Sequence, residues 1–270
     1  MRLLELSSGV KQISSKLSED DLLRALKTEA KNSYDAARRR PIFTKVETKE
    51  PFFVADPSKV KRSSKFIVDG LTTLLSSWRG WADRLHSVRG WTSRELADSR
   101  NTGELCLLIP TDKARVHVCD ASSFYRSFKK AHAAFETEKI DNDALCTWLK
   151  SLYKVARTVN DKLPKYEEPE SAAQFMQALK ALDSSRKAVM ATRGEDLPNI
   201  EREDARRAWA AFGDDLQSTI NKLLDPDDNG FSTHTSLYNL PDDREVWTGG
   251  KCIIITLDEY ESLVKRSSLK

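Results

Sequence analysis

The stretch "DDREVWTGGKCIIIT", residues 242–256, joins two runs of β-forming residues through a glycine turn. A Val-Trp pair precedes Gly249 and Gly250, and a run of apolar, β-branched residues follows them. Such runs on either side of a turn predict two β-strands. Glu245 opens the first run, so this glutamate is either an exposed residue beside a hairpin or a catalytic carboxylate.

Two more strands are predicted upstream of this stretch. "ELCLLIP", residues 104–110, is an apolar run typical of a buried strand, and "ARVHVCD", residues 114–120, alternates apolar with polar residues. The intervening "TDK" suits a turn, so the pair resembles a hairpin. His117 alternates within the second strand, where it would face solvent.

Helical periodicity dominates the rest of the chain. Residues 19–40 form an amphipathic pattern that opens with acidic residues, closes with Arg38–Arg40 and stops at Pro41. Residues 66–79 predict a second helix. Residues 121–224 contain three further amphipathic segments separated by prolines, which is typical of a helical bundle.

These patterns predict an α+β fold that is predominantly helical, with a small β core and an inserted helical bundle. Residues 1–65 would form an N-terminal helix and an extended segment with one or two edge strands. The core would comprise residues 66–120 and 225–270, and the bundle would be an insertion of residues 121–224.

Composition limits the class of protein. The chain is 39% hydrophobic and 31% charged, and no apolar run approaches the roughly 18 residues that cross a bilayer. Its four cysteines form no CxxC pair, which argues against a zinc ribbon. We therefore expect a cytoplasmic protein without a membrane partner and without a metal site.

The charge of the chain is unevenly distributed. Residues 1–118 contain 22 Lys and Arg against 15 Asp and Glu, a balance of +7, whereas residues 119–270 have a balance of −4. Interleaved Trp and Arg in "SWRGWADRLHSVRGW", residues 77–91, favour half-buried tryptophans with stacked arginines, and the alternative is stacking on single-stranded nucleic acid. One functional alternative is therefore a non-enzymatic module that binds protein or nucleic acid.

Hydroxyl and basic side chains precede the strand 104–110. Thr92 and Ser93 stand before a short predicted helix, "RELADSR", and Arg84 and Arg89 lie just upstream. A helix N-terminus with hydroxyls and a guanidinium beside it is a reasonable phosphate site. The alternative is that Thr92 or Ser93 simply caps the helix.

The segment "TSRELADSRNTGELCLLIPTDKARVHV" resembles ADP-ribosyltransferases, which place a Thr-Ser or Ser-Ser dipeptide before a short helix, a buried strand and a P-x-x-A turn. "DDREVWTGGKCIII" is similar to the same family's catalytic glutamate region. The resemblance implies a transferase that moves ADP-ribose from NAD to a macromolecular target.

The resemblance also assigns roles to residues. Glu245 would be the catalytic carboxylate, with Asp243 two positions earlier. Arg84 or Arg89 would bind the phosphates of NAD. Thr92 and Ser93 would orient its ribose.

A third motif, "DPDDNG" at residues 225–230, matches the start of a calcium-binding loop. Its twelfth position is Ser236 rather than the bidentate glutamate, and the same residues are typical of a plain turn.

Overall fold

The computed structural model of the protein describes residues 14–59, 67–100, 102–134, 142–159, 171–186, 209 and 215–268. The chain divides into two compact units. Unit 1 comprises Met1–Ser63, Trp81–Phe124 and Phe231–Lys270, and unit 2 comprises Ser64–Gly80 and Tyr125–Gly230. Residues 66–80, which the sequence assigned to the β-containing core, therefore belong to the helical unit.

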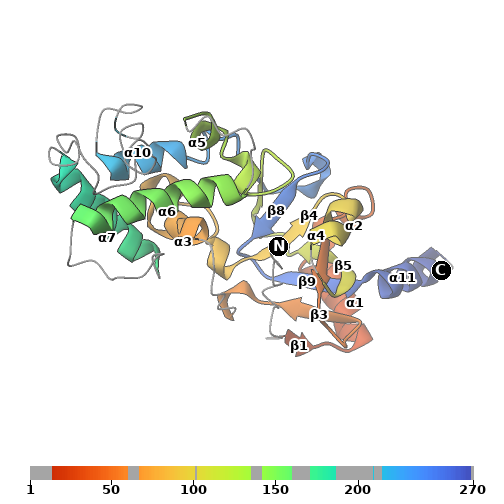
Figure 1. The fold of residues 1–270 in the computed structure, drawn as a ribbon. Helices are drawn as coiled ribbons and strands as arrows, with labels where there is room; N and C mark the ends of the chain where they lie inside the picture. Colours follow the sequence, from red (N-terminus) through yellow and green to blue (C-terminus); the bar gives the residue numbers. More distant parts are fainter. Residues whose placement is uncertain are drawn as a thin grey trace. The chain divides into compact units, whose positions relative to one another are not determined.

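Unit 1 is built on a sheet in which the described residues supply nine strands, all paired antiparallel (Figure 1). Their order is β1-β3-β9-β5-β2-β4-β8-β6-β7. The strands are β1 (Ser14–Lys16), β2 (Phe43–Val46), β3 (Phe52–Ala55), β4 (Val88–Trp91), β5 (Glu104–Pro110), β6 (Val116–Val118), β7 (Ser232–His234), β8 (Glu245–Thr248) and β9 (Cys252–Thr256).

The prediction of a predominantly helical protein with a small β core is therefore wrong. Strands β1 and β4, which the sequence did not predict, have only three and four residues. A period-2 pattern cannot stand out over so few positions, and it is the pairing with distant strands that stabilises them.

The strands at residues 104–110 and 252–256 were predicted, but both predicted hairpins are wrong. Strand β8 pairs with β4 and β6, whereas β9 pairs with β3 and β5. Strand β5 pairs with β2 and β9, whereas β6 pairs with β7 and β8. In both cases a short turn carries the chain to a different part of the sheet.

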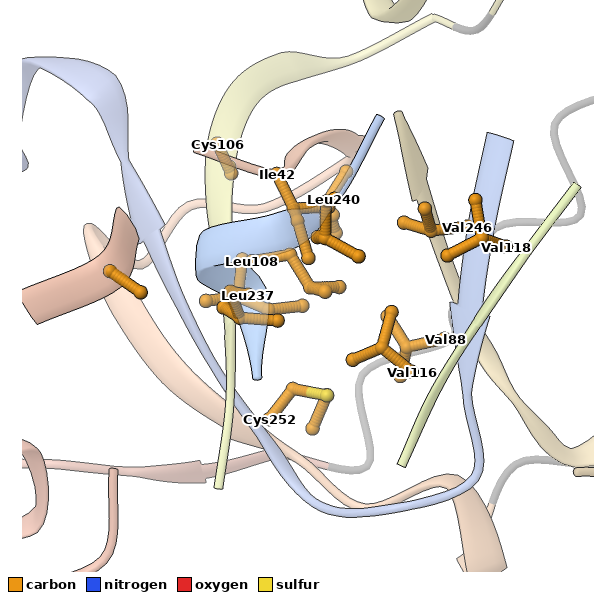
Figure 2. Packing of buried hydrophobic residues seen from close by; sticks show 14 of the residues in the cluster. Ile42, Val88, Cys106, Leu108, Val116, Val118, Leu237, Leu240, Val246 and Cys252 are labelled. Carbon is orange, nitrogen blue, oxygen red and sulfur yellow. The ribbon is translucent and has the colours of Figure 1, made fainter. Parts of the chain in front are cut away.

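One face of the sheet covers the main apolar core. Figure 2 shows side chains of β4, β6 and β8 pointing toward those of β5 and of the 237–240 turn, so the sheet curls around this core. The labelled residues include Val88, Val116, Val118 and Val246 on one side, and Leu108, Leu237 and Leu240 on the other.

Helices cover the other face of the sheet where β3, β5 and β9 lie. Ile109, Ile253 and Ile255 pack there with Leu22 and Leu26 of α1 (Glu19–Thr28). Leu263 of α11 (Leu257–Ser268) completes this cluster. Strands β5 and β9 are thus buried on both faces, which explains their continuous apolar runs.

Two shorter helices complete unit 1. The single helix predicted over 19–40 is two helices, α1 and α2 (Lys31–Ala37), because the chain turns at Glu29 and Ala30. Helix α4 (Arg94–Arg100) contacts β2 and β4. It begins directly after Thr92 and Ser93, as the sequence predicted.

Unit 2 is helical. Its described elements are α3 (Ile67–Leu74), η2 (Ser76–Trp78), η4 (Tyr125–Ser127), α5 (Lys129–Ala134), α6 (Asn142–Val159), α7 (Ala172–Ser184) and α10 (Leu216–Leu223). The Asp183 carboxylate joins two of them, since it accepts the Leu216 backbone N–H at the start of α10 and the Trp209 indole N–H. Burial raises the pKa of Asp183.

In the described part of the chain, no helix combines the length and the apolar character that crossing a membrane requires.

The turn between β8 and β9 depends on glycine. A Cβ atom at Gly250 would lie 2.4 Å from the Cβ of Ala114. We predict that Gly250→Ala destabilises the protein by about 1–3 kcal/mol through overpacking. Ala114→Gly in the same chain removes that contact and should restore part of the loss. Urea denaturation of the two single variants and the double variant measures this coupling. Additive losses would contradict the contact.

Candidate functional site

Glu245 is the first residue of β8 and pairs with Trp91 at the end of β4. The neighbouring pair is hydrogen-bonded, because the Thr92 N–H donates to the Arg244 carbonyl over 2.9 Å. In an antiparallel ladder the next pair is then non-hydrogen-bonded, and its two side chains lie close together on one face. Glu245 is only 6% exposed. The alternative of an exposed residue beside a hairpin is therefore wrong.

Both carboxylate oxygens of Glu245 have a donor. Arg84 Nη2 donates to Oε1 over 2.8 Å, and the Phe124 backbone N–H donates to Oε2 over 2.8 Å. The side chains of Arg84 and Glu245 are 1% and 8% exposed. A buried carboxylate requires such compensation, since desolvation of an unpaired charge is costly.

Aromatic rings surround the guanidinium of Arg84. Its central carbon lies 3.9 Å from the centroid of the Phe124 ring and 5.0 Å from that of Trp247. Cation–π attraction therefore stabilises the charge that Glu245 neutralises. Among the described residues, Arg84 of the Trp-Arg segment thus stacks on rings from outside the segment, and not on the segment's own tryptophans.

Thr92 and Ser93 follow Trp91 in the chain and hold local structure. The Thr92 hydroxyl accepts the Arg244 N–H over 3.0 Å, which ties the end of β4 to the start of β8. The Ser93 hydroxyl accepts the Leu96 N–H over 3.3 Å and donates to Glu95, so Ser93 caps α4. Four predicted positions, Arg84, Thr92, Ser93 and Glu245, thus lie on neighbouring segments of unit 1.

The two remaining predicted residues are placed differently. Arg89 is half-buried on β4 opposite Trp247, and its Nη2 lies 3.5 Å from the Arg84 carbonyl oxygen. Asp243 is exposed and adopts a φ of 55°. This left-handed conformation costs free energy for a residue with a side chain, and such conformations occur at functional sites.

Sequence reasoning missed an aromatic cluster around His117. Trp81 and Trp247 lie 5.0 and 5.2 Å from the His117 ring, centroid to centroid. His117 is 2% exposed, so the expectation that it faces solvent is wrong. The Ala82 N–H donates to His117 Nε2, which leaves Nδ1 protonated to donate to the Thr233 hydroxyl.

The described residues include no group of three or more His, Cys, Asp or Glu side chains arranged to hold a metal ion. The "DPDDNG" segment forms a turn in which the Asp225 carboxylate accepts the N–H groups of Asp227 and Asp228. Its carboxylate thus stabilises backbone, as expected of a plain turn.

Comparison with protein-family models, curated proteins and solved structures finds no match for this chain. A functional assignment for this chain therefore depends on the geometry of the site itself.

The pair of Arg84 and Glu245 gives a stability prediction. Arg84→Met leaves a buried carboxylate without its counter-ion and should lower the free energy of unfolding by about 3–5 kcal/mol. Arg84→Met with Glu245→Leu removes both charges and should lose less. Urea denaturation compares the two proteins. A larger loss in the double variant would contradict a charge-based role for the pair.

His117 gives a pH prediction. Burial, with a smaller effect from the Arg115 charge, lowers the pKa of His117 to about 4. The unfolded chain therefore binds more protons between about pH 6.5 and 4. The contribution of neutral His117 to the free energy of unfolding is complete above this pH window. It falls by up to about 1.4 kcal/mol per pH unit as the pH drops through the window.

The measurement is urea denaturation between pH 7 and 4.5 of the wild type and of His117→Gln, whose side chain stays neutral. The wild type should lose stability more steeply than the variant. Parallel losses would show that another group governs acid destabilisation.

Proposed function

We propose that unit 1 is an NAD-dependent ADP-ribosyltransferase that modifies a macromolecular target. One observation supports this most. The pairing of β4 with β8 places Thr92 opposite Arg244, one position along the ladder from Glu245, although Thr92 and Arg244 are 152 positions apart in the sequence. The resemblance in the sequence requires this convergence of the Thr-Ser dipeptide and the glutamate.

The reaction needs one well-placed carboxylate. The bond between nicotinamide and C1′ of the ribose breaks, and nicotinamide leaves with the electron pair. A nucleophile of the target then bonds to C1′ and loses its proton. Glu245 would stabilise the positive charge that develops on the ribose in the oxocarbenium-like transition state. The Phe124 N–H and Arg84 hold this carboxylate in place.

The proposal gives the two arginines different roles. Arg84 is buried and bonded to Glu245, so in this proposal it is a positioning residue. Arg89 then becomes the candidate for the phosphates of NAD. In this proposal Thr92 and Ser93 orient the ribose of NAD. Asp243 is exposed and lies two positions before Glu245, the first residue of β8.

Trp91 offers a further contact. It lies opposite Glu245, and in the described part of the chain its buried indole N–H has no hydrogen-bond acceptor. Buried donors are normally satisfied in folded proteins. A ribose oxygen bound beside Glu245 would supply the missing acceptor.

The first test is NAD binding by the wild-type protein. A ligand that binds only the folded state at a hundredfold excess over its Kd adds about 2.7 kcal/mol of stability. NAD at millimolar concentration should therefore raise the melting temperature, and the protein should release nicotinamide from NAD. A wild-type protein that does neither would overturn the proposal.

The second test assigns the carboxylate. Glu245→Gln should lower nicotinamide release by about a hundredfold or more, because it removes the charge at the reacting centre. Glu104→Gln is the matched control, since Glu104 is an exposed glutamate on β5 of the same sheet. Circular dichroism must show that both variants are folded. Release by folded Glu245→Gln at the wild-type rate would exclude Glu245 as the catalytic residue.

A further inference from the structure

Two turns of unit 1 bring three basic residues together at one edge of the sheet. Strands β5 and β9 end at the paired residues Pro110 and Cys252. Beyond them, the Thr111 N–H donates to the Lys251 carbonyl over 2.9 Å. The turn after β5 carries Lys113 and Arg115, and all three basic side chains are exposed. We call Lys113, Arg115 and Lys251 the basic ridge.

Contacts between the turns fix this arrangement. Ala114 lies between the two basic residues of its turn and packs so closely on Gly250 that a Cβ atom there would be 2.4 Å away. Gly249 is similarly close to Ala82, with 3.1 Å between the corresponding Cβ positions. The two turns are therefore held together by backbone and methyl contacts that do not require the charges to attract one another.

Among the residues that the structure describes, no carboxylate neutralises the basic ridge. Within the described residues, none of its three side chains forms an ion pair. Asp112 is the nearest acid in the sequence, but its carboxylate accepts the backbone N–H groups of Asn32 and Ser33 at the start of α2. Three exposed cations thus lie on two adjacent turns, and an anionic ligand would find no carboxylate paired with them among the described residues.

An aromatic side chain lies next to the ridge. Arg115 directly precedes β6 and is two positions from His117, and the Arg115 charge contributes to lowering the pKa of His117. Trp81 packs on His117 and is only partly buried. Cationic side chains beside a partly exposed indole suit phosphates with neighbouring bases better than they suit carboxylates.

We propose that the basic ridge binds the phosphate backbone of single-stranded nucleic acid. The three cations would contact phosphates, and the partly exposed Trp81 ring would contact a base. This surface lies beyond the end of β8 opposite to Glu245. The proposal does not rest on transfer of ADP-ribose, and it holds for a catalytically inactive protein as well.

The test is fluorescence anisotropy of a labelled 20-nucleotide oligothymidine with the full-length protein. The triple variant Lys113→Gln, Arg115→Gln, Lys251→Gln removes the ridge. The matched control Lys27→Gln, Lys31→Gln, Arg39→Gln removes three exposed cations of α1, α2 and the residues after α2. Both variants change the net charge equally, and all six positions are exposed, so both should fold.

The wild type should bind with an affinity that falls steeply with salt. The ridge variant should bind at least tenfold more weakly at low salt. Each phosphate contact contributes roughly 0.7 to the slope of log K against log salt. The loss of three contacts should therefore reduce the magnitude of the slope by about 2. The control variant should stay close to the wild type.

Three results would overturn the proposal. The first is failure of the wild type to bind the oligonucleotide at low salt. The second is an equal loss of affinity in the control variant and the ridge variant, which would mean that net charge alone explains binding. The third is displacement of the oligonucleotide by poly-glutamate of similar length at equal charge concentration, which would mean that the surface recognises acidic chains in general.

Discussion

The buried ion pair between Arg84 and Glu245 is the constraint on which this part of unit 1 depends. A charged carboxylate can lie inside the protein only if fixed donors compensate for lost water. Here the donors come from two other segments, the η3 turn (Arg84–His86) and the loop before Phe124. Placing one glutamate on β8 therefore fixes the positions of two pieces of chain that have no regular pairing of their own.

Aromatic packing makes this arrangement rigid. Phe124 and Trp247 cover the guanidinium of Arg84, and Phe231 packs on both rings. His117 belongs to the same cluster and accepts a hydrogen bond from the Ala82 N–H. The face of β6 and β8 that turns away from the main core is thus a second, smaller core made of rings and one charge pair. A carboxylate held this way needs no reorganisation when charge develops near it, which is what electrostatic catalysis requires.

The sequence predicted features that depend on local pattern. The apolar runs of β5 and β9 and the Ser93 cap each have a signal within a few neighbouring residues. It did not predict the Arg84–Glu245 pair, because this contact joins residues 161 positions apart in the sequence. His117 shows how far local sequence pattern can predict the surroundings of a residue. Alternation correctly indicates that it turns away from the main core, but only the aromatic cluster buries it.

The order of the strands makes the site a late product of folding. Strand β8 lies between β4 and β6, and residues 125–230 of the chain separate it from both. Contacts at such sequence separation carry a large loop-closure cost, so they form slowly. Until β8 inserts, Arg84 lacks its carboxylate, Phe124 lacks its acceptor and Thr92 lacks Arg244. Completion of the sheet and assembly of the proposed catalytic residues are therefore the same event, and a chain that fails to insert β8 has neither.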